Sequence, residues 1–157
     1  MPPIRPFLWF NAEAEEAANY YVSIFENSRV LGVARYGDAG PGPKDAVMTV
    51  HLELDGQPFT ALNGGPQFSF TEAISFVVEC ATQEEVDRYW NALSRGGEPG
   101  PCGWLKDKYG LSWQIVPRGL DEMMRDPDPS RSRRVMEAVL TMKKLDIAAL
   151  QRAYAGR

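Results

Sequence analysis

The sequence predicts an α+β fold, in which two tandem βαβββ modules form a half-open cup and a C-terminal helical tail follows. Strand and helix patterns occur in the same order in residues 1–66 and 72–117. The two segments also align directly: when Phe7 is placed on Phe76, Glu15-Glu16 falls on Glu84-Glu85 and Tyr20-Tyr21 on Tyr89-Trp90. After Pro117 the apolar residues recur only at helical spacing. We weight the internal repeat most, because repeated self-similarity is a strong indicator of fold.

The first module opens with an apolar strand over residues 4–10, followed by an amphipathic helix over 12–25 that Asn11 is expected to cap. Residues 28–36 and 46–54 are expected strands, separated by the Gly- and Pro-rich loop 37–43. Asp55-Gly56 predicts a hairpin into the strand 57–62. The turn Asn63-Gly64-Gly65-Pro66 then ends the module.

The second module repeats this order. Residues 73–80 predict a strand, and Thr82, with Glu85 three positions later, predicts the cap of a helix over 83–95. Gly96-Gly97 ends that helix. Residues 103–106 and 111–116 are expected strands, joined by a turn in which Lys106 and Asp107 should be solvated. Residues 1–117 are therefore expected to form one paired βαβββ domain.

Residues 118–157 predict short helices. One carries Leu120 and is stopped at Asp126-Pro127-Asp128-Pro129; Ser130 is expected to cap the next, and Asp146 the last. Short helices are marginally stable alone, so this tail needs a surface to pack against. That surface belongs either to the same chain or to a second subunit.

Composition excludes several functions. The net charge is −4, and the acidic body contrasts with a tail holding more basic than acidic residues. This modest basic surplus does not favour a nucleic-acid partner. The apolar runs are too short for a membrane span, and the chain reads as a cytoplasmic protein.

Histidine and cysteine usage limits the metal chemistry. His51 is the single histidine, so a site built from several imidazoles is excluded. Cys80 and Cys102 have no CxxC spacing, and a small buried thiol is the favoured interpretation of each.

Several segments resemble the PhnB-like branch of the vicinal oxygen chelate (glyoxalase/bleomycin-resistance/dioxygenase) superfamily. The segments that carry the resemblance are Phe7-Leu8-Trp9-Phe10, Glu15 to Tyr21, Asp55 to Phe59, Asn63-Gly64-Gly65-Pro66, Cys102 to Gln114, and Met142 to Leu150. The resemblance implies a paired βαβββ fold of the glyoxalase/bleomycin-resistance/dihydroxybiphenyl dioxygenase type, and a homodimer. Members of this branch often carry the label 3-demethylubiquinone-9 3-methyltransferase. The sequence, however, contains no Gly-rich strand-to-helix turn of the kind that cradles S-adenosylmethionine.

The resemblance also implies where a metal would bind. The superfamily's ligand positions fall on Pro6, Ala61 or Asn63, Ser75 and Gln114 in this sequence. A stable divalent site needs several histidine or carboxylate ligands at one point, and this set supplies none. We therefore expect no metal and no cofactor.

The functional hypothesis is metal-independent binding of a small, partly apolar ligand in the cup. The residues predicted to line the site are Trp9, Asn63, Cys102, Trp104, Trp113 and Gln114, because pockets combine apolar walls with few polar groups. The alternative is an enzyme on a small oxygenated substrate, either a metal-dependent lyase or dioxygenase, or the methyltransferase of the family label. The sequence leaves open which of the two is correct, and it identifies no catalytic residue.

Overall fold

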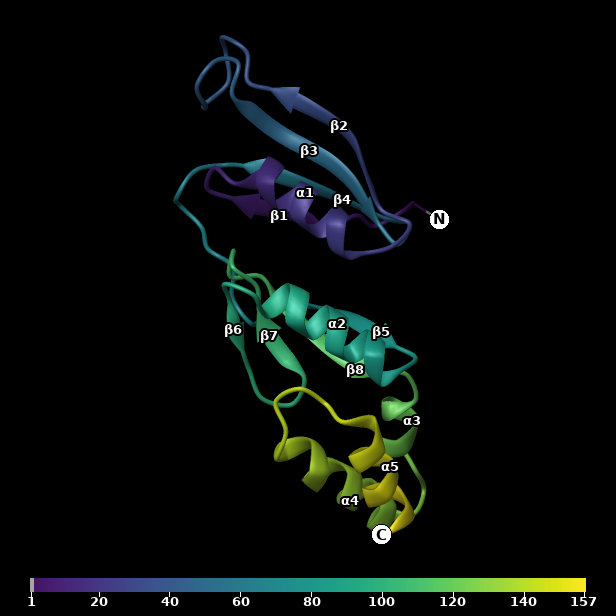
Figure 1. Ribbon diagram of the computed structural model, residues 1–157. Helices are drawn as coiled ribbons and strands as arrows, with labels where there is room; N and C mark the ends of the chain where they lie inside the picture. The colour runs from purple at the N-terminus through teal and green to yellow at the C-terminus, as the bar shows by residue number, and fades with distance from the viewer. Residues whose placement is uncertain (1) are drawn as a thin grey trace. The chain divides into compact units, whose positions relative to one another are not determined.

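The computed structural model describes residues 2–157, and the chain divides into two compact units, Met1–Phe70 and Thr71–Arg157 (Figure 1). Each unit contains a four-stranded mixed sheet and a helix packed against it, so the predicted α+β class with βαβββ modules is confirmed. Among residues 2–157 every helix is too short or too polar to serve as a membrane span.

The first unit follows the predicted element order. Its elements are β1 (Phe7–Phe10), α1 (Ala14–Ile24), β2 (Arg29–Arg35), β3 (Val47–Leu54) and β4 (Gln57–Asn63). The strands lie in the order β1-β4-β3-β2, with β1 parallel to β4 and the other pairs antiparallel. Residues from α1 and from one face of the sheet form the buried core: Leu8, Phe10, Ala17, Ala18, Tyr21, Val50, Leu52 and Ala61.

The beginning of α1 differs from the prediction. The N-cap position is Glu13, whose side chain makes no capping hydrogen bond, so Asn11 is not the cap. The N–H of Ala14 instead donates to Asn63 Oδ1 at 2.8 Å. The free N–H groups at a helix start need acceptors, and here one comes from the end of β4. This long-range cap connects α1 to the turn that ends the module.

The second unit has the same topology as the first. Its sheet contains β5 (Ser75–Cys80), β8 (Ser112–Pro117), β7 (Trp104–Lys106) and the two-residue β6 (Glu98–Pro99), in the order β5-β8-β7-β6. The helix α2 (Gln83–Ser94) is capped as predicted, since Thr82 accepts a hydrogen bond from the N–H of Glu85. Its buried residues Val86, Trp90 and Leu93 pack over one face of the sheet.

The tail forms three helices, α3 (Leu120–Met124), α4 (Pro129–Leu140) and α5 (Ile147–Ala155). Asp128 caps α4 and accepts from the N–H of Ser130, so the prediction of Ser130 as the cap is wrong. Pro129 therefore occupies the first helical turn, where its missing N–H is not needed. Asp146 caps α5 as predicted.

The tail packs on the second unit of the same chain. Val135, Val139, Leu145 and Leu150 form a buried cluster, against which Cys102 and Val116 pack. The N–H of Cys102 donates to Met142 O, and the N–H of Gly103 donates to Lys143 O, both at 2.8 Å. Gln83 adds two more hydrogen bonds, to Leu145 O and from the N–H of Ile147.

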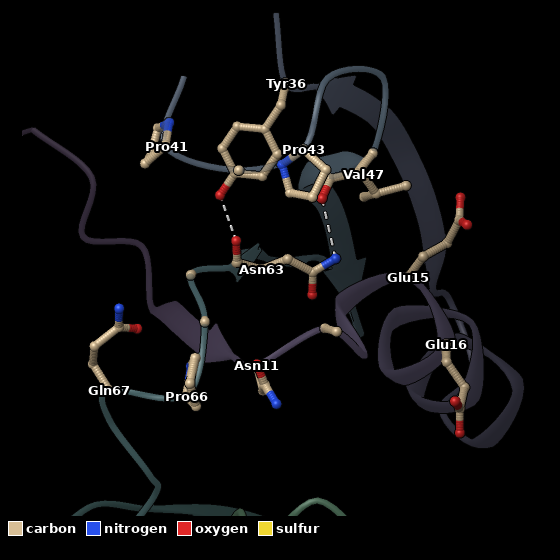
Figure 2. Close-up of a pocket in the computed structure, with 15 residues that line it drawn as sticks. Asn11, Glu15, Glu16, Tyr36, Pro41, Pro43, Val47, Asn63, Pro66 and Gln67 are labelled. Carbon is tan, nitrogen blue, oxygen red and sulfur yellow. Dashed lines mark hydrogen bonds between the residues drawn. The ribbon is translucent and has the colours of Figure 1, made fainter. Parts of the chain in front are cut away.

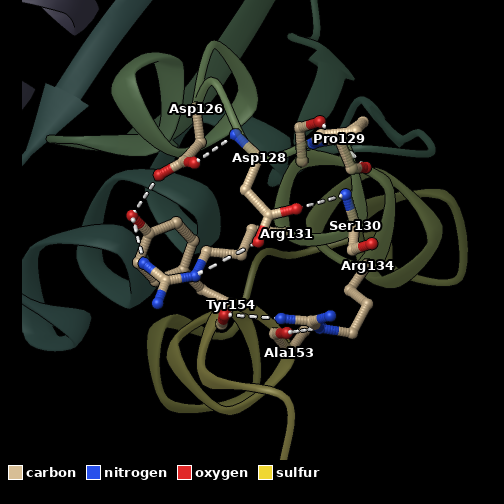
Figure 3. Close-up of polar contacts among 9 residues, drawn as sticks. Asp126, Asp128, Pro129, Ser130, Arg131, Arg134, Ala153 and Tyr154 are labelled. Carbon is tan, nitrogen blue, oxygen red and sulfur yellow. Dashed lines mark hydrogen bonds and ion pairs between the residues drawn. The ribbon is translucent and has the colours of Figure 1, made fainter.

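Polar contacts hold the tail helices together (Figure 3). The hydroxyl of Tyr154 donates to Asp126 Oδ2, and the guanidinium of Arg131 lies 5.1 Å from the centre of the Tyr154 ring. Arg134 donates to the carbonyls of Ala153 and Tyr154, at 2.8 and 3.1 Å. Those carbonyls lie in the last turn of α5, and the Ala153 carbonyl also accepts from the N–H of the C-cap residue Gly156, so Arg134 adds a side-chain cap to the C-terminal end of the helix.

Candidate functional site

The open face of the second sheet, opposite α2, carries two of the predicted site residues side by side. Side chains alternate along a strand, and directly paired residues share a face. Gln114 of β8 is paired with Trp104 of β7 on one side and with Val77 of β5 on the other. Trp104 and Gln114 are therefore neighbours on this face.

Gln114 lies beside a cavity of about 360 Å³ at the C-terminal end of this face. Val77, Val116 and Met124 supply apolar wall, and Gln114 supplies an amide. Its Nε2 donates to Ser75 Oγ at 2.9 Å, which fixes the orientation of the amide on the open face.

Trp113 lies on the opposite face and is 3% exposed. Its indole Nε1 donates to Asp107 Oδ2 at 2.9 Å, and its ring centre is 5.7 Å from that of Phe76. The structure therefore separates Trp113 from Gln114 and places it in the core beneath α2. The cause is strand alternation, since consecutive residues point to opposite faces.

The expectation that Asp107 is solvated is wrong, because only 2% of this residue is exposed. Its carboxylate accepts from the backbone N–H groups of Tyr109 and Leu111, at 2.9 and 3.1 Å, and from the Trp113 indole. A buried carboxylate needs such donors. Asp107 therefore fixes the β7–β8 turn and, with it, the position of the strands that carry Trp104 and Gln114.

Trp104 lines a second cavity on the open face, of about 330 Å³. Pro99 and Pro101 form its other apolar wall, and Lys106 and Ser112 contribute polar groups. Lys106 forms an ion pair with Glu72, which lies shortly before β5. Sequence reasoning missed Ser112 and Glu72. Alternation could have placed Ser112 beside Gln114, but nothing local indicates the contact between Glu72 and Lys106.

The Lys106–Glu72 pair shifts the pKa of both groups. The hydrogen bond from Lys106 lowers the pKa of Glu72, and the same bond raises the pKa of Lys106. Both side chains remain charged at neutral pH. Glu98 of β6 is paired directly with Lys106. The ammonium group of Lys106 on the open face therefore lies between two carboxylates, those of Glu72 and Glu98.

In the first unit, Trp9 lies on the sheet face opposite α1 and shapes the turn that follows β4. Its indole N–H donates to Gly65 O at 2.9 Å, and its ring meets that of Phe68 edge-on at 4.9 Å. A Cβ at Gly64 would overlap the Trp9 ring, so glycine permits this close approach. Trp9 is half-buried.

Asn63 borders a cleft of about 720 Å³ in the first unit, between the β2–β3 loop and the start of α1 (Figure 2). Its amide is engaged at both ends: Oδ1 accepts from Ala14, and Nδ2 donates to Val47 O at 3.1 Å. Its backbone carbonyl accepts from the hydroxyl of Tyr36. Asn63 therefore organises the wall of the cleft rather than presenting a free amide to it.

Cys102 contacts the helical tail. It precedes β7 with a backbone φ of 61° and packs against the tail cluster. Cys80 is fully buried, and desolvation raises the pKa of its thiol to about 11. A thiol protonated at neutral pH is a poor nucleophile.

The metal-ligand positions that the family resemblance implies do not fit a divalent ion here. Ala61 is buried and has no donor atom, Asn63 uses its amide to cap α1, and Ser75 and Gln114 bond to each other. Zinc and iron sites require imidazole, thiolate or carboxylate donors. Among residues 2–157 no three histidine, cysteine or carboxylate side chains are grouped as a metal site. His51 bonds to Thr60 Oγ1 at 3.1 Å on another strand pair.

Comparison with known proteins gives a consistent family match. The family model described as 3-demethylubiquinone-9 3-methyltransferase matches residues 2–116. No curated protein matches the chain.

Three solved structures share the fold. A PhnB protein from Bacillus cereus, described as a candidate 3-demethylubiquinone-9 3-methyltransferase, is 36% identical; the match covers 74% of this chain and 99% of that one, with a TM-score of 0.65. A protein from Pseudomonas aeruginosa is 22% identical over 74% and 98% of the two chains, with a TM-score of 0.62. The fosfomycin resistance protein FosX from Listeria monocytogenes is 14% identical over 78% and 97%, with a TM-score of 0.52. The last two show similarity of fold alone.

Proposed function

The chain belongs to the PhnB-like 3-demethylubiquinone-9 3-methyltransferase family of the vicinal oxygen chelate superfamily, and from this premise we propose that it binds a small, partly apolar molecule without using a metal ion. The binding surface is the open face of the second sheet. The observation that carries the proposal is the direct pairing of Trp104 with Gln114 on that face, with a cavity next to each residue.

The chemistry of this pair suits an organic ligand. An indole ring offers a large apolar surface for stacking, and an amide offers a donor and an acceptor that orient the ligand. Small-molecule sites typically combine apolar walls with few fixed polar groups. The bond from Gln114 to Ser75 supplies that fixed orientation. In the first unit, we propose that the indole ring of Trp9 likewise offers an apolar surface to a ligand.

Three predicted site residues are not retained in this proposal. Trp113 packs under α2, Asn63 caps α1, and Cys102 contacts the tail. The structural contacts of these residues account for their positions without a ligand.

A thermal-shift screen of small aromatic and oxygenated compounds tests the proposal. A ligand present at about 100 times its Kd should stabilise the protein by about 2.7 kcal/mol. Trp104→Leu and Gln114→Leu should reduce the shift, whereas Gln151→Leu, at an exposed position in α5, should leave it unchanged. A hit with equal shifts in all three variants would place binding elsewhere. Elemental analysis that finds about one zinc, iron or manganese per chain would contradict the metal-independent mode.

The second candidate function is an enzyme that acts on a small oxygenated substrate. Gln114 favours it, because the residue stands at a ligand position of the superfamily and keeps an amide oxygen. The methyltransferase form has less support, since Asn63-Gly64-Gly65-Pro66 leads to β5 without an intervening helix. Adding S-adenosylmethionine to the same screen separates the alternatives, because a methyltransferase should be stabilised by it.

A further inference from the structure

Ser112 carries a buried hydroxyl group with no hydrogen-bond partner. Ser112 is 1% exposed. Among the buried side-chain nitrogen and oxygen atoms of residues 2–157, its Oγ is the one without a hydrogen-bond partner. Buried polar groups are nearly always paired, so an exception calls for an explanation. Ser112 lines the 330 Å³ cavity beside Trp104, and strand pairing places it on the same open face.

The Lys106–Glu72 ion pair lies at the cavity that Ser112 lines. Ser112 is paired with Lys106 on one side and with Ser75 on the other. Glu72 lies three residues before Ser75, so its ion pair with Lys106 connects the segment that leads into β5 with β7, and these strands flank β8 on its two sides. The ion pair and the residue whose hydroxyl lacks a partner therefore border the same cavity.

This ion pair can open at little cost. The side chains of Lys106 and Glu72 are 38% and 58% exposed, and water screens an ion pair at such a position. Glu72 would move into solvent, where a carboxylate is well hydrated. Glu98 remains beside Lys106 in either state, so exchanging Glu72 for another carboxylate leaves the local charge unchanged.

Building on the proposed function, we propose that this cavity binds a small aromatic carboxylate, whose anionic group replaces Glu72 on Lys106 and accepts a hydrogen bond from Ser112 Oγ. Its ring would lie against Trp104 and between Pro99 and Pro101, which form the apolar part of the lining. Glu72 acts as an internal mimic of the ligand, since it already presents a carboxylate to Lys106. Neutral and cationic aromatic molecules lack the group that displaces it.

Benzoate, benzamide and benzylamine test this inference, because they share a ring and differ in charge. Their binding is followed by the indole N–H resonance of Trp104 in ¹H–¹⁵N spectra of the full chain, assigned with Trp104→Phe. We expect benzoate to shift this resonance and to bind at least about tenfold more tightly than the other two. Equal binding of benzoate and benzamide would overturn the anion-recognition step and leave the proposed function standing.

Variants separate recognition from structure. Lys106→Met should weaken benzoate binding about tenfold, and Ser112→Ala by about fivefold. Glu72→Gln should strengthen it, because it removes the competing carboxylate; a purely structural ion pair would give no such gain. Lys44→Met is the matched control, since Lys44 forms an exposed ion pair with Asp38 in the first unit. If benzoate at concentrations up to about 20 mM does not shift the indole N–H resonance of Trp104, the inference is wrong. The proposed function is tested separately by the thermal-shift screen.

Discussion

Removal of the Asp107 carboxylate should strongly destabilise the second unit. Its two oxygens accept hydrogen bonds from the N–H groups of Tyr109 and Leu111 and from the Trp113 indole. A hydrogen bond to a charged group contributes about 1.5–3 kcal/mol, and part of this is recovered where water reaches the freed donor. We therefore expect Asp107→Ala to lower the free energy of unfolding by about 4 kcal/mol.

The asparagine variant separates the contributions. Asp107→Asn keeps one oxygen for the two backbone donors, but it can place an amide N–H against the Trp113 indole N–H. We expect a loss of about 2 kcal/mol, falling to about 1 kcal/mol in a Trp113→Phe background, where the opposed donor is absent. Urea unfolding followed by circular dichroism measures all five chains: the unaltered protein, the three single variants and the double variant. A loss below about 1 kcal/mol for Asp107→Ala, or an Asn cost that is the same in both backgrounds, would refute this account.

Three further predictions concern the thiols and the tail. Iodoacetamide should label Cys102 in the folded protein but Cys80 only after unfolding, because a thiol with a pKa of about 11 is about one-thousandth thiolate at pH 8; equal labelling rates would contradict this. Tyr154→Phe should lower the melting temperature at pH 7, and the difference should shrink near pH 3. The Tyr154 hydroxyl depresses the pKa of Asp126 below 3.8, so its stabilisation is present above that value and is lost as the pH falls through the folded pKa; a constant difference would contradict this. A chain that ends at Pro117 should lose the cooperative unfolding of the second unit. We also propose that the tail helps to hold together the homodimer that the family resemblance implies, so a truncated chain that stays a folded dimer in light scattering would contradict both roles of the tail.

The corrected residues have a common cause. Asn11 and Ser130 are the expected caps because both are polar and stand just before helical patterns, yet α1 is capped from β4 and α4 begins two residues earlier than expected, in the Asp-Pro segment. Local patterns show that a helix needs a cap, but tertiary contacts decide which acceptor reaches it. Trp113 and Gln114 illustrate a different limit, because alternation separates them while only packing decides which face α2 covers.

The sequence by itself determined the two βαβββ modules, the order of their elements, the Thr82 cap and the lack of metal donors at the superfamily's ligand positions. These features follow from local periodicity and residue chemistry, which each segment carries with it. Only the tertiary structure decided that Asp107 is buried, that Asn63 serves α1, and that Glu72 and Lys106 meet beside the Ser112 hydroxyl. Those facts depend on strand register and on contacts between residues far apart in the chain. Burial changes the free energy of a polar group, and a local sequence pattern does not show which polar groups are buried.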